Sequence, residues 1–444
     1  MSRWASLGFW VAVLAFFVGM TGVVDTNLTL AADSPLISET RAAQHGLERQ
    51  WHTQITIDPG SNRVTHLVYV PKSETCPDTL FVQTERATVF AINAETGKTL
   101  WSRLVGRPYL MSEPVGCNDL MVGVLNGSTL TMLDRASGRI LWAKAFTSVP
   151  ASGPVLSKRF AYVPYNSGCI AAYPIRKGED TVGKPVTETE EESVASQTSA
   201  SNVIPPLGEV EPLLCTSLFR IENAPVLFQN DVMKDRLAWI NRKGLYVGSL
   251  VSRGSGFKLD YSLSSARTFA STPAFVPSRY LTSGTGEADA EAVQVKNPFG
   301  ALVVSSKKGH VTAIRTDNGG TLWEYQLGEP IVNPAVAIQS RAYVISEFGL
   351  MICFDVPTGK ILWTRKNASQ FVAQTKDRLY VLNQLGDRLL ILRASDGSRF
   401  DQLTIPGFTK VVANDKTDRM FFATDTGFIQ SLRQRGQKEP VRYR

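Results

Sequence analysis

Four short stretches of this chain resemble one another: AINAETGKTLW (Ala91–Trp101), TMLDRASGRILW (Thr131–Trp142), AIRTDNGGTLW (Ala313–Trp323) and CFDVPTGKILW (Cys353–Trp363). Trp101 and Trp142 lie 41 residues apart, and Trp323 and Trp363 lie 40 apart. Repeats of about 40 to 45 residues are typical of four-stranded propeller blades and of some helical repeats. The stretches are rich in β-branched residues and are interrupted by Gly, Asn and Asp, which favours short strands over helices.

Each stretch has the pattern of a strand, a tight turn and a second strand. The expected turn glycines are Gly97, Gly138, Gly319 and Gly359. A glycine accepts a positive φ without a Cβ penalty, and in three copies an Asn or Asp four residues earlier can bond the turn backbone. The Trp follows on the next strand, where its ring can pack against neighbouring structure. We name the four strands of a blade A to D in chain order, so this turn joins strands C and D.

A second series of glycines predicts the number of blades. Glycines directly before strand C are Gly127, Gly168, Gly244, Gly309, Gly349, Gly386 and Gly427, and Arg86-Ala87 takes that place in the first blade. Most spacings are near one period, and spacings of 76 and 65 residues correspond to one period plus insertions of about 36 and 25 residues. The sequence therefore predicts an all-β, eight-bladed β-propeller of four-stranded antiparallel blades, with seven blades and one degenerate hairpin as the alternative.

The last blade has too little chain for a strand D of its own. LERQWHTQI (Leu47–Ile55) resembles the strand after the turn and places Trp51 at the Trp position. Because a propeller has to close its ring, we expect this N-terminal strand to complete the last blade. A strand that stays outside the ring is the alternative. The propeller is then expected over residues 49–436, after a linker over 33–48.

The AxDxxTGxxxW-like copies resemble the tryptophan-docking repeat of the PQQ-repeat (quinoprotein alcohol dehydrogenase-like) family, over about residues 49–436. That family includes PQQ-dependent dehydrogenases and non-enzymatic relatives such as BamB-type outer-membrane assembly factors. The resemblance implies the propeller fold and leaves the function open, because one fold hosts many functions. Full Trp copies occur in four blades, in addition to Trp51, while Lys258 and Asp401 stand at the expected Trp position elsewhere.

Residues 1–32 have the pattern of an export signal. An uncharged, mostly apolar stretch over residues 7–24 follows Arg3, and small residues precede Asp33. This pattern favours a cleaved signal peptide. The alternative is an uncleaved membrane anchor, because the apolar stretch approaches the length that spans a bilayer. In both cases we expect a periplasmic or extracytoplasmic protein, with membrane contact only if the segment is uncleaved.

Charge and cysteine content argue against several kinds of partner and site. The 444 residues include 47 basic and 40 acidic ones, a net charge of +7, and the basic residues are scattered, which argues against nucleic-acid binding. The cysteines are Cys76, Cys117, Cys169, Cys215 and Cys353, with no CxxC motif. Neither they nor the four histidines show metal-ligand spacing. A disulfide between Cys76 and Cys117 stays open, because both precede strands B and are expected on one face.

The two faces of the propeller differ in what they are expected to carry. Insertions over about residues 176–212 and 278–298 belong to the face formed by the A–B and C–D connections. On the opposite face, two B–C turns carry the basic residues Arg242, Lys243, Lys307 and Lys308. These are interpreted either as solvated charges at hairpin tips or as a patch for an anion or an acidic partner. Residues 437–444 form a basic, polar tail, which we expect to be solvent-exposed.

The sequence favours a non-catalytic exported scaffold that holds another protein, with envelope assembly as one such role. The chain has no HExxH, no phosphate-binding glycine loop and no CxxCH, so we expect neither catalytic residues nor a cofactor. One alternative is a PQQ-dependent dehydrogenase, for which the resemblance implies PQQ with Ca²⁺ and an adjacent Cys-Cys pair that this chain lacks. A carbohydrate-binding propeller is the other, with Tyr109, Tyr165, Phe269 and Phe348 available to stack on sugars.

Overall fold

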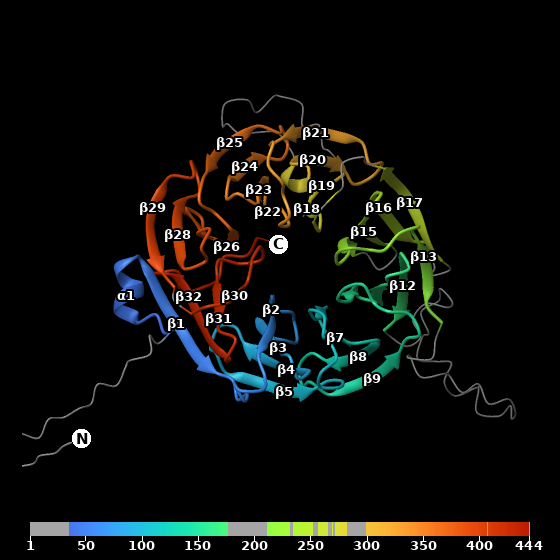
Figure 1. The fold of residues 1–444 in the computed structure, drawn as a ribbon, viewed down its shortest axis with the longest axis horizontal. Coiled ribbons are helices and arrows are strands. Elements are labelled where there is room, and N and C mark those ends of the chain that lie inside the picture. Colours follow the sequence, from blue (N-terminus) through green and yellow to red (C-terminus); the bar gives the residue numbers. More distant parts are fainter. Residues whose placement is uncertain are drawn as a thin grey trace, which may run out of the picture. The chain divides into compact units, whose positions relative to one another are not determined.

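Eight four-stranded sheets follow one another around a ring (Figure 1). The computed structural model describes residues 35–175, 211–230, 234–251, 256–264, 269, 271–281, 299–405 and 407–443. Within each sheet the strands pair antiparallel, with strand A at the channel and strand D at the outer edge. The prediction of an eight-bladed propeller is therefore confirmed.

The first four blades come from residues 64–264. Their strands are β2 (Val64–Val70), β3 (Thr79–Thr84), β4 (Thr88–Asn93) and β5 (Thr99–Leu104); β6 (Gly116–Cys117), β7 (Met121–Asn126), β8 (Thr129–Asp134) and β9 (Ile140–Ala145); β10 (Val155–Leu156), β11 (Phe160–Pro164), β12 (Cys169–Pro174) and β13 (Leu213–Thr216); and β14 (Val226–Asn230), β15 (Asp235–Asn241), β16 (Gly244–Leu250) and β17 (Phe257–Ser264).

The other four blades come from the rest of the chain, with one N-terminal strand. Their strands are β18 (Ala274–Val276), β19 (Ala301–Ser305), β20 (His310–Arg315) and β21 (Thr321–Gln326); β22 (Val336–Ile338), β23 (Arg341–Ile345), β24 (Met351–Asp355) and β25 (Ile361–Arg365); β26 (Gln370–Gln374), β27 (Arg378–Leu382), β28 (Arg388–Arg393) and β29 (Arg399–Thr404); and β30 (Lys410–Val411), β31 (Met420–Ala423), β32 (Phe428–Gln434) and β1 (Leu47–Gln54). Helix α1 (Glu39–Gln44) precedes β1, and the short 3₁₀ helix η3 (Ser278–Tyr280) follows β18.

The core lies between the faces of neighbouring blades. Strand β3 is buried at every position and β4 at its central positions, which matches their continuous apolar runs. Strand β5 at the outer edge is different, because Trp101 is its only buried residue. Each large apolar side chain buried in this way stabilises the fold by about 1.5–3 kcal/mol relative to exposure.

The repeat tryptophans dock onto the C–D turn of the next blade. The indole Nε1 groups donate hydrogen bonds to backbone oxygens, from Trp51 to Ala94 at 2.8 Å, Trp101 to Arg135 at 2.9 Å, Trp323 to Val356 at 2.7 Å and Trp363 to Ala394 at 3.3 Å. Trp142 is different. Within the described residues its Nε1 is buried without a hydrogen-bond partner, and the turn that would face it falls in the undescribed stretch after Ile175.

The turn positions require glycine for a second reason besides their positive φ, which is the close approach of the Trp ring. Gly97, Gly138 and Gly359 have φ of +73°, +68° and +73°. A Cβ atom on Gly138 would lie 2.5 Å from Cδ2 of Trp101, and one on Gly359 would lie 2.6 Å from Cγ of Trp323. No side chain fits between the turn and the indole ring. The repeat therefore couples a glycine in one blade to the Trp of the preceding blade.

The sequence assignment of Lys258 to the Trp position of blade 4 is wrong. Tyr261 stands opposite Val247 as Trp101 stands opposite Ala91, but Tyr261 follows its partner by 14 residues and Trp101 by 10, so the C–D connection of blade 4 is four residues longer. Tyr261 then packs on Gly319 of the next blade, and its hydroxyl lies 3.2 Å from the Arg315 backbone oxygen.

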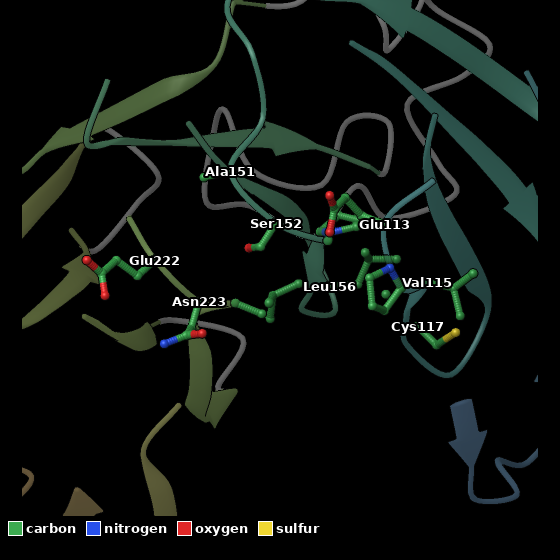
Figure 2. A pocket seen from close by; sticks show the side chains of 14 residues that line it. Glu113, Val115, Cys117, Ala151, Ser152, Leu156, Glu222 and Asn223 are labelled. Carbon is green, nitrogen blue, oxygen red and sulfur yellow. The ribbon is translucent and has the colours of Figure 1, made fainter. Parts of the chain in front are cut away.

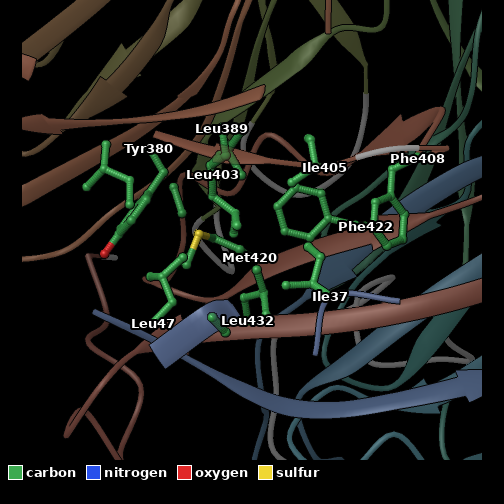
Figure 3. Packing of buried hydrophobic residues seen from close by; sticks show 14 of the residues in the cluster. Ile37, Leu47, Tyr380, Leu389, Leu403, Ile405, Phe408, Met420, Phe422 and Leu432 are labelled. Carbon is green, nitrogen blue, oxygen red and sulfur yellow. The ribbon is translucent and has the colours of Figure 1, made fainter. Parts of the chain in front are cut away.

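The N-terminal strand closes the ring as expected. Strand β1 pairs antiparallel with β32, with Trp51 opposite Ser431. Figure 3 shows the buried cluster at this closure, in which Ile37 and Leu47 lie near Met420 and Phe422 of blade 8.

A second contact spans the same closure. Asp401 does occupy the Trp position of blade 7, opposite Ile391. Its Oδ2 lies 2.7 Å from Nδ1 of His45, just before β1, so an ion pair or hydrogen bond stands where other blades use an indole ring.

The expectation of a solvent-exposed tail is wrong for the last described residues. Arg442 pairs with Asp78, and Tyr443 is only 6% exposed. Both are held at the A–B end of the channel by residues from several blades.

Several sequence expectations fall where the structure is not described. Residues 1–34 are outside the described part, as are 176–210 and 282–298 of the two insertions. Residues 35–48, expected as a linker, contain α1, and Ile37 in this stretch is fully buried. In the described part, no helix is long and apolar enough to cross a membrane.

Candidate functional site

A pocket of about 500 Å³ opens in the channel wall where blades 2, 3 and 4 begin (Figure 2). Its lining comes from residues 113–117, 151–156 and 222–224, at or just before strands β6, β10 and β14. Glycines let two of these segments touch. A Cβ on Gly116 would lie 2.0 Å from the Pro154 oxygen, and one on Gly153 would lie 2.3 Å from the Pro114 oxygen. The pocket is therefore walled by closely packed backbone.

Four polar side chains line this pocket: Glu113, Ser152, Glu222 and Asn223. Figure 2 shows Glu113 and Glu222 at opposite sides, with Ser152 between them. The Ser152 Oγ is buried and has no hydrogen-bond partner among the described residues. Gln83 fixes one wall, because its side chain accepts from the Val115 N–H and donates to the Glu113 backbone oxygen. These groups can accept hydrogen bonds from a ligand, but they do not form a nucleophile–base pair.

The pocket residues do not fit PQQ with Ca²⁺. Calcium needs six to eight oxygen ligands, mostly converging carboxylates and carbonyls. Glu113 and Glu222 come from different blades and lie apart in Figure 2. Across the described residues there is no group of three or more His, Cys, Asp or Glu side chains that could hold a metal.

The face formed by the D–A and B–C connections, called here the DA/BC face, carries exposed apolar side chains in its loops. The large exposed hydrophobic residues in its loops are Tyr109, Leu110, Met111, Val149, Leu218, Phe219, Val332, Phe348 and Leu385. Tyr109, Leu218 and Leu385 are each more than 80% exposed. In the described A–B and C–D connections, no large hydrophobic residue is exposed in this way. The other large exposed hydrophobic residues of the described part lie on the outer strands D. Among the loops, apolar exposure is thus confined to the DA/BC face, which is a mark of an interaction surface.

The four basic residues predicted for this face lie on two neighbouring B–C turns. Arg242 and Lys243 stand between β15 and β16, and Lys307 and Lys308 stand between β19 and β20. Arg242 is largely exposed, and its Nε lies 4.0 Å from Glu222. The Lys243 Nζ lies 5.4 Å from the centre of the Phe219 ring. The basic residues are thus mixed with apolar and acidic ones, and an anion site there remains a prediction.

Two of the four aromatic residues considered for sugar stacking are unavailable. Tyr109 and Phe348 are exposed, at 86% and 65%. Tyr165 and Phe269 are buried, and the Tyr165 hydroxyl lies 2.8 Å from that of Tyr173. The sequence placed these loops on the correct face but could not show which rings point inward.

All five cysteines are free thiols in the structure, including Cys76 and Cys117. Burial raises the pKa of the thiols of Cys117, Cys215 and Cys353 to about 12. Such thiols are almost entirely protonated at neutral pH and are poor nucleophiles.

Comparison with known proteins adds a family to this geometry. The family model described as outer membrane protein assembly factor BamB matches residues 48–244 and 293–434. Proteins of that name from Yersinia pestis and from Bordetella pertussis (strain Tohama I) are similar to this chain, 24% identical over 112 residues and 32% identical over 103 residues. These matches cover 22% and 21% of this chain and 28% and 26% of those relatives. The chain thus spans about a quarter of the length of the relatives it matches.

Solved structures with the same fold include BamB from Moraxella catarrhalis and Sqt1 from Saccharomyces cerevisiae. The first has a TM-score of 0.55 and 12% identity, covering 87% of this chain and 98% of that one. The second has a TM-score of 0.59 and 9% identity, covering 86% and 97%. At these identities the likeness shows the fold alone.

Proposed function

We propose, from the premise that this chain belongs to the family described as outer membrane protein assembly factor BamB, that it is a non-catalytic scaffold of the cell envelope whose DA/BC face holds another protein. Export, expected from residues 7–24, is part of this proposal. The observation that carries it is that the exposed apolar side chains of the described loops all lie on the DA/BC face. A rigid ring that presents such side chains offers a preformed surface, which lowers the entropic cost of binding.

The partner surface is expected to combine apolar and acidic groups. Leu218 and Phe219 stand in the connection between blades 3 and 4, followed by the exposed Arg220. Lys243 on the next B–C turn lies over the Phe219 ring. Aromatic and arginine side chains of this kind are frequent anchors in protein interfaces. A partner carboxylate beside an apolar side chain would complement them.

Site-specific photo-cross-linking in cells tests this function. A benzophenone amino acid is placed at Tyr109, Leu218 or Leu385 on the DA/BC face, and at Thr96 or Ser137 in exposed C–D turns as matched controls. We expect a discrete cross-linked species, with one envelope protein identified by mass spectrometry, from the first set only. Equal products from both sets, or none from the DA/BC positions in folded protein, would refute the assignment of this face.

A calorimetric titration separates the scaffold from the dehydrogenase alternative. The full chain is titrated with PQQ in excess Ca²⁺ at several temperatures. We expect no saturable heat, because the described residues do not assemble a Ca²⁺ ligand set. Saturable binding at micromolar or lower concentration would contradict the non-catalytic assignment and would justify assays of alcohol or sugar oxidation.

A further inference from the structure

The last described residues fill a site at the A–B end of the channel, on the face opposite to the DA/BC face. We propose that this end is a peptide-binding site for an extended apolar–Arg–Tyr segment, which the chain's own Val441–Tyr443 occupies in cis. The proposal is independent of the function proposed above, because none of its contacts involves the DA/BC face. It rests on the contacts of residues 437–443, called here the strap.

Consecutive strap residues contact opposite sides of the ring. Arg442 Nη2 lies 2.6 Å from Oδ2 of Asp78, in the A–B turn of blade 1. The Tyr280 hydroxyl, in the A–B connection of blade 5, donates to the Tyr443 backbone oxygen at 3.3 Å. Blades 1 and 5 face each other across the ring, and the C-terminal end of the chain is drawn near its centre (Figure 1). The strap therefore lies across the channel.

Asp78 is a prepared receptor for a guanidinium group. Its carboxylate accepts the Tyr69 hydroxyl at 2.6 Å and the Lys72 backbone N–H at 2.9 Å, and Arg442 adds two N–H donors. Burial would raise the pKa of Asp78, but the hydrogen bonds from Arg442 and Tyr69 outweigh it and lower the pKa below its ordinary value. A buried carboxylate that loses its cation is strongly destabilising. The two-pronged geometry favours arginine over lysine.

Two further anchors set the order of residues in the bound segment. The buried carboxylate of Asp418, in blade 8, accepts the Val441 N–H at 3.0 Å. The Tyr443 N–H donates to the Lys416 oxygen at 3.0 Å, and its hydroxyl donates to the Gln374 oxygen of blade 7 at 2.6 Å. The Tyr443 ring belongs to the buried cluster between blades 6 and 7, against which Val441 also packs. The site thus distinguishes an apolar residue, an arginine and a tyrosine in sequence.

The connection to the strap allows it to leave without unfolding a blade. Gly436 has φ +85°, and a Cβ atom there would meet nothing within 4 Å. Lys438 and Glu439 are exposed, and the strap pairs with the ring through a single isolated bridge, Thr417 with Arg442. Opening of the strap leaves Asp78 without its cation and breaks the 2.6 Å bond from buried Arg419 to the Lys438 oxygen, so an incoming segment has to replace these contacts. While tethered, the strap has an effective concentration of about millimolar, so a segment binding in trans competes poorly.

Removing the two side chains that anchor the strap tests the proposal directly. The full chain with Arg442→Ala and Tyr443→Ala is mixed with a fluorescent peptide of residues 437–443, Gln-Lys-Glu-Pro-Val-Arg-Tyr, and binding is followed by anisotropy. We expect saturable binding at least tenfold tighter than to the wild-type chain, and loss of binding when the peptide's Arg or Tyr is replaced by Ala. Absence of binding to the folded double variant, or equal binding by both proteins, overturns the proposal.

If the double variant does not fold, hydrogen exchange on the wild-type chain tests the proposal instead. The Val441 and Tyr443 amides are protected by Asp418 and by the Lys416 oxygen. Millimolar unlabelled peptide should displace the strap and raise exchange in residues 437–443 severalfold, with other segments unchanged. A peptide in which Arg is replaced by Ala is the control and should have no effect. Unchanged exchange at saturating wild-type peptide would show that the site does not accept a segment in trans.

Discussion

Replacing Gly359 with alanine measures how strongly one blade depends on the indole ring of the blade before it. The residue has φ +73°, and an L-residue in this region costs about 1–2 kcal/mol. The new Cβ would also lie 2.6 Å from Cγ of Trp323. The ring has to move, which weakens its 2.7 Å hydrogen bond to the Val356 oxygen, a loss of about 0.5–1.5 kcal/mol. Its stack on Phe354, with ring centres 5.2 Å apart, accounts for a further loss of about 0.5–1.5 kcal/mol.

The total, about 2–5 kcal/mol, has a matched control in Gly386→Ala. Gly386 has nearly the same φ, +75°, but a Cβ there meets nothing within 4 Å, so only the backbone term of about 1–2 kcal/mol applies. Urea denaturation followed by far-UV circular dichroism should give a clearly lower midpoint for Gly359→Ala than for Gly386→Ala. Adding Trp323→Ala to both variants should shrink the difference, because the Cγ atom nearest the new Cβ is then absent. Equal midpoints for the two alanine variants would refute the docking argument.

Three further outcomes are expected. Ala87→Gly should raise the free energy of unfolding by up to about 1.6 kcal/mol, because Ala87 has φ +57° and relief of about 1–2 kcal/mol exceeds the added unfolded-state entropy of about 0.4–1 kcal/mol. A urea midpoint lower than that of the wild type would contradict this. The lowered pKa of Asp78 means that its contribution is present above the ordinary carboxyl pKa and is lost as pH falls through the lower, folded value. The Asp78→Asn variant should therefore have a lower melting temperature than the wild type at pH 7, and it should lose less stability than the wild type below about pH 4. Thermal melts at a series of pH values test this, and parallel curves of melting temperature against pH for the two proteins would contradict it. The pKa values of Cys215 and Cys353 are raised to about 12, so about one in ten thousand of these thiols is ionised at pH 8. Both should therefore resist alkylation in the folded protein. Rapid alkylation, detected by mass spectrometry, would contradict this.

Most of the fold could be predicted because its determinants are local. The C–D turn, its glycine and the following Trp lie within a dozen residues of one another, so each blade carries its own signal. Blade 4 was assigned wrongly because its C–D connection is four residues longer than that of blade 1, which places the docking aromatic at Tyr261. An aromatic residue on strand D that faces Gly319 of the next blade was the available signal, but a fixed spacing from the turn led to Lys258 instead.

The strap and the exposed face were harder to predict, because their determinants are not local. Arg442 contacts Asp78, 364 residues away, and the sequence around either residue has no pattern that predicts the pairing. Composition alone suggested a solvated tail. In the same way, the loop aromatics could be assigned to the correct face, but the burial of Tyr165 depends on its contacts with Phe146 and Tyr173 in the folded ring.

Ring closure by the first and last strands has a consequence for how the protein is made. Glu48 of β1 and its partner Arg433 of β32 are 385 positions apart. At about 5–20 residues per second, a ribosome completes β1 roughly 20 to 80 seconds before β32 exists. During that time the earliest strand has no partner, and the growing row of blades ends in an open, apolar edge that invites aggregation. The first strand to be synthesised is thus among the last to fold, and the nascent chain needs protection in the interval.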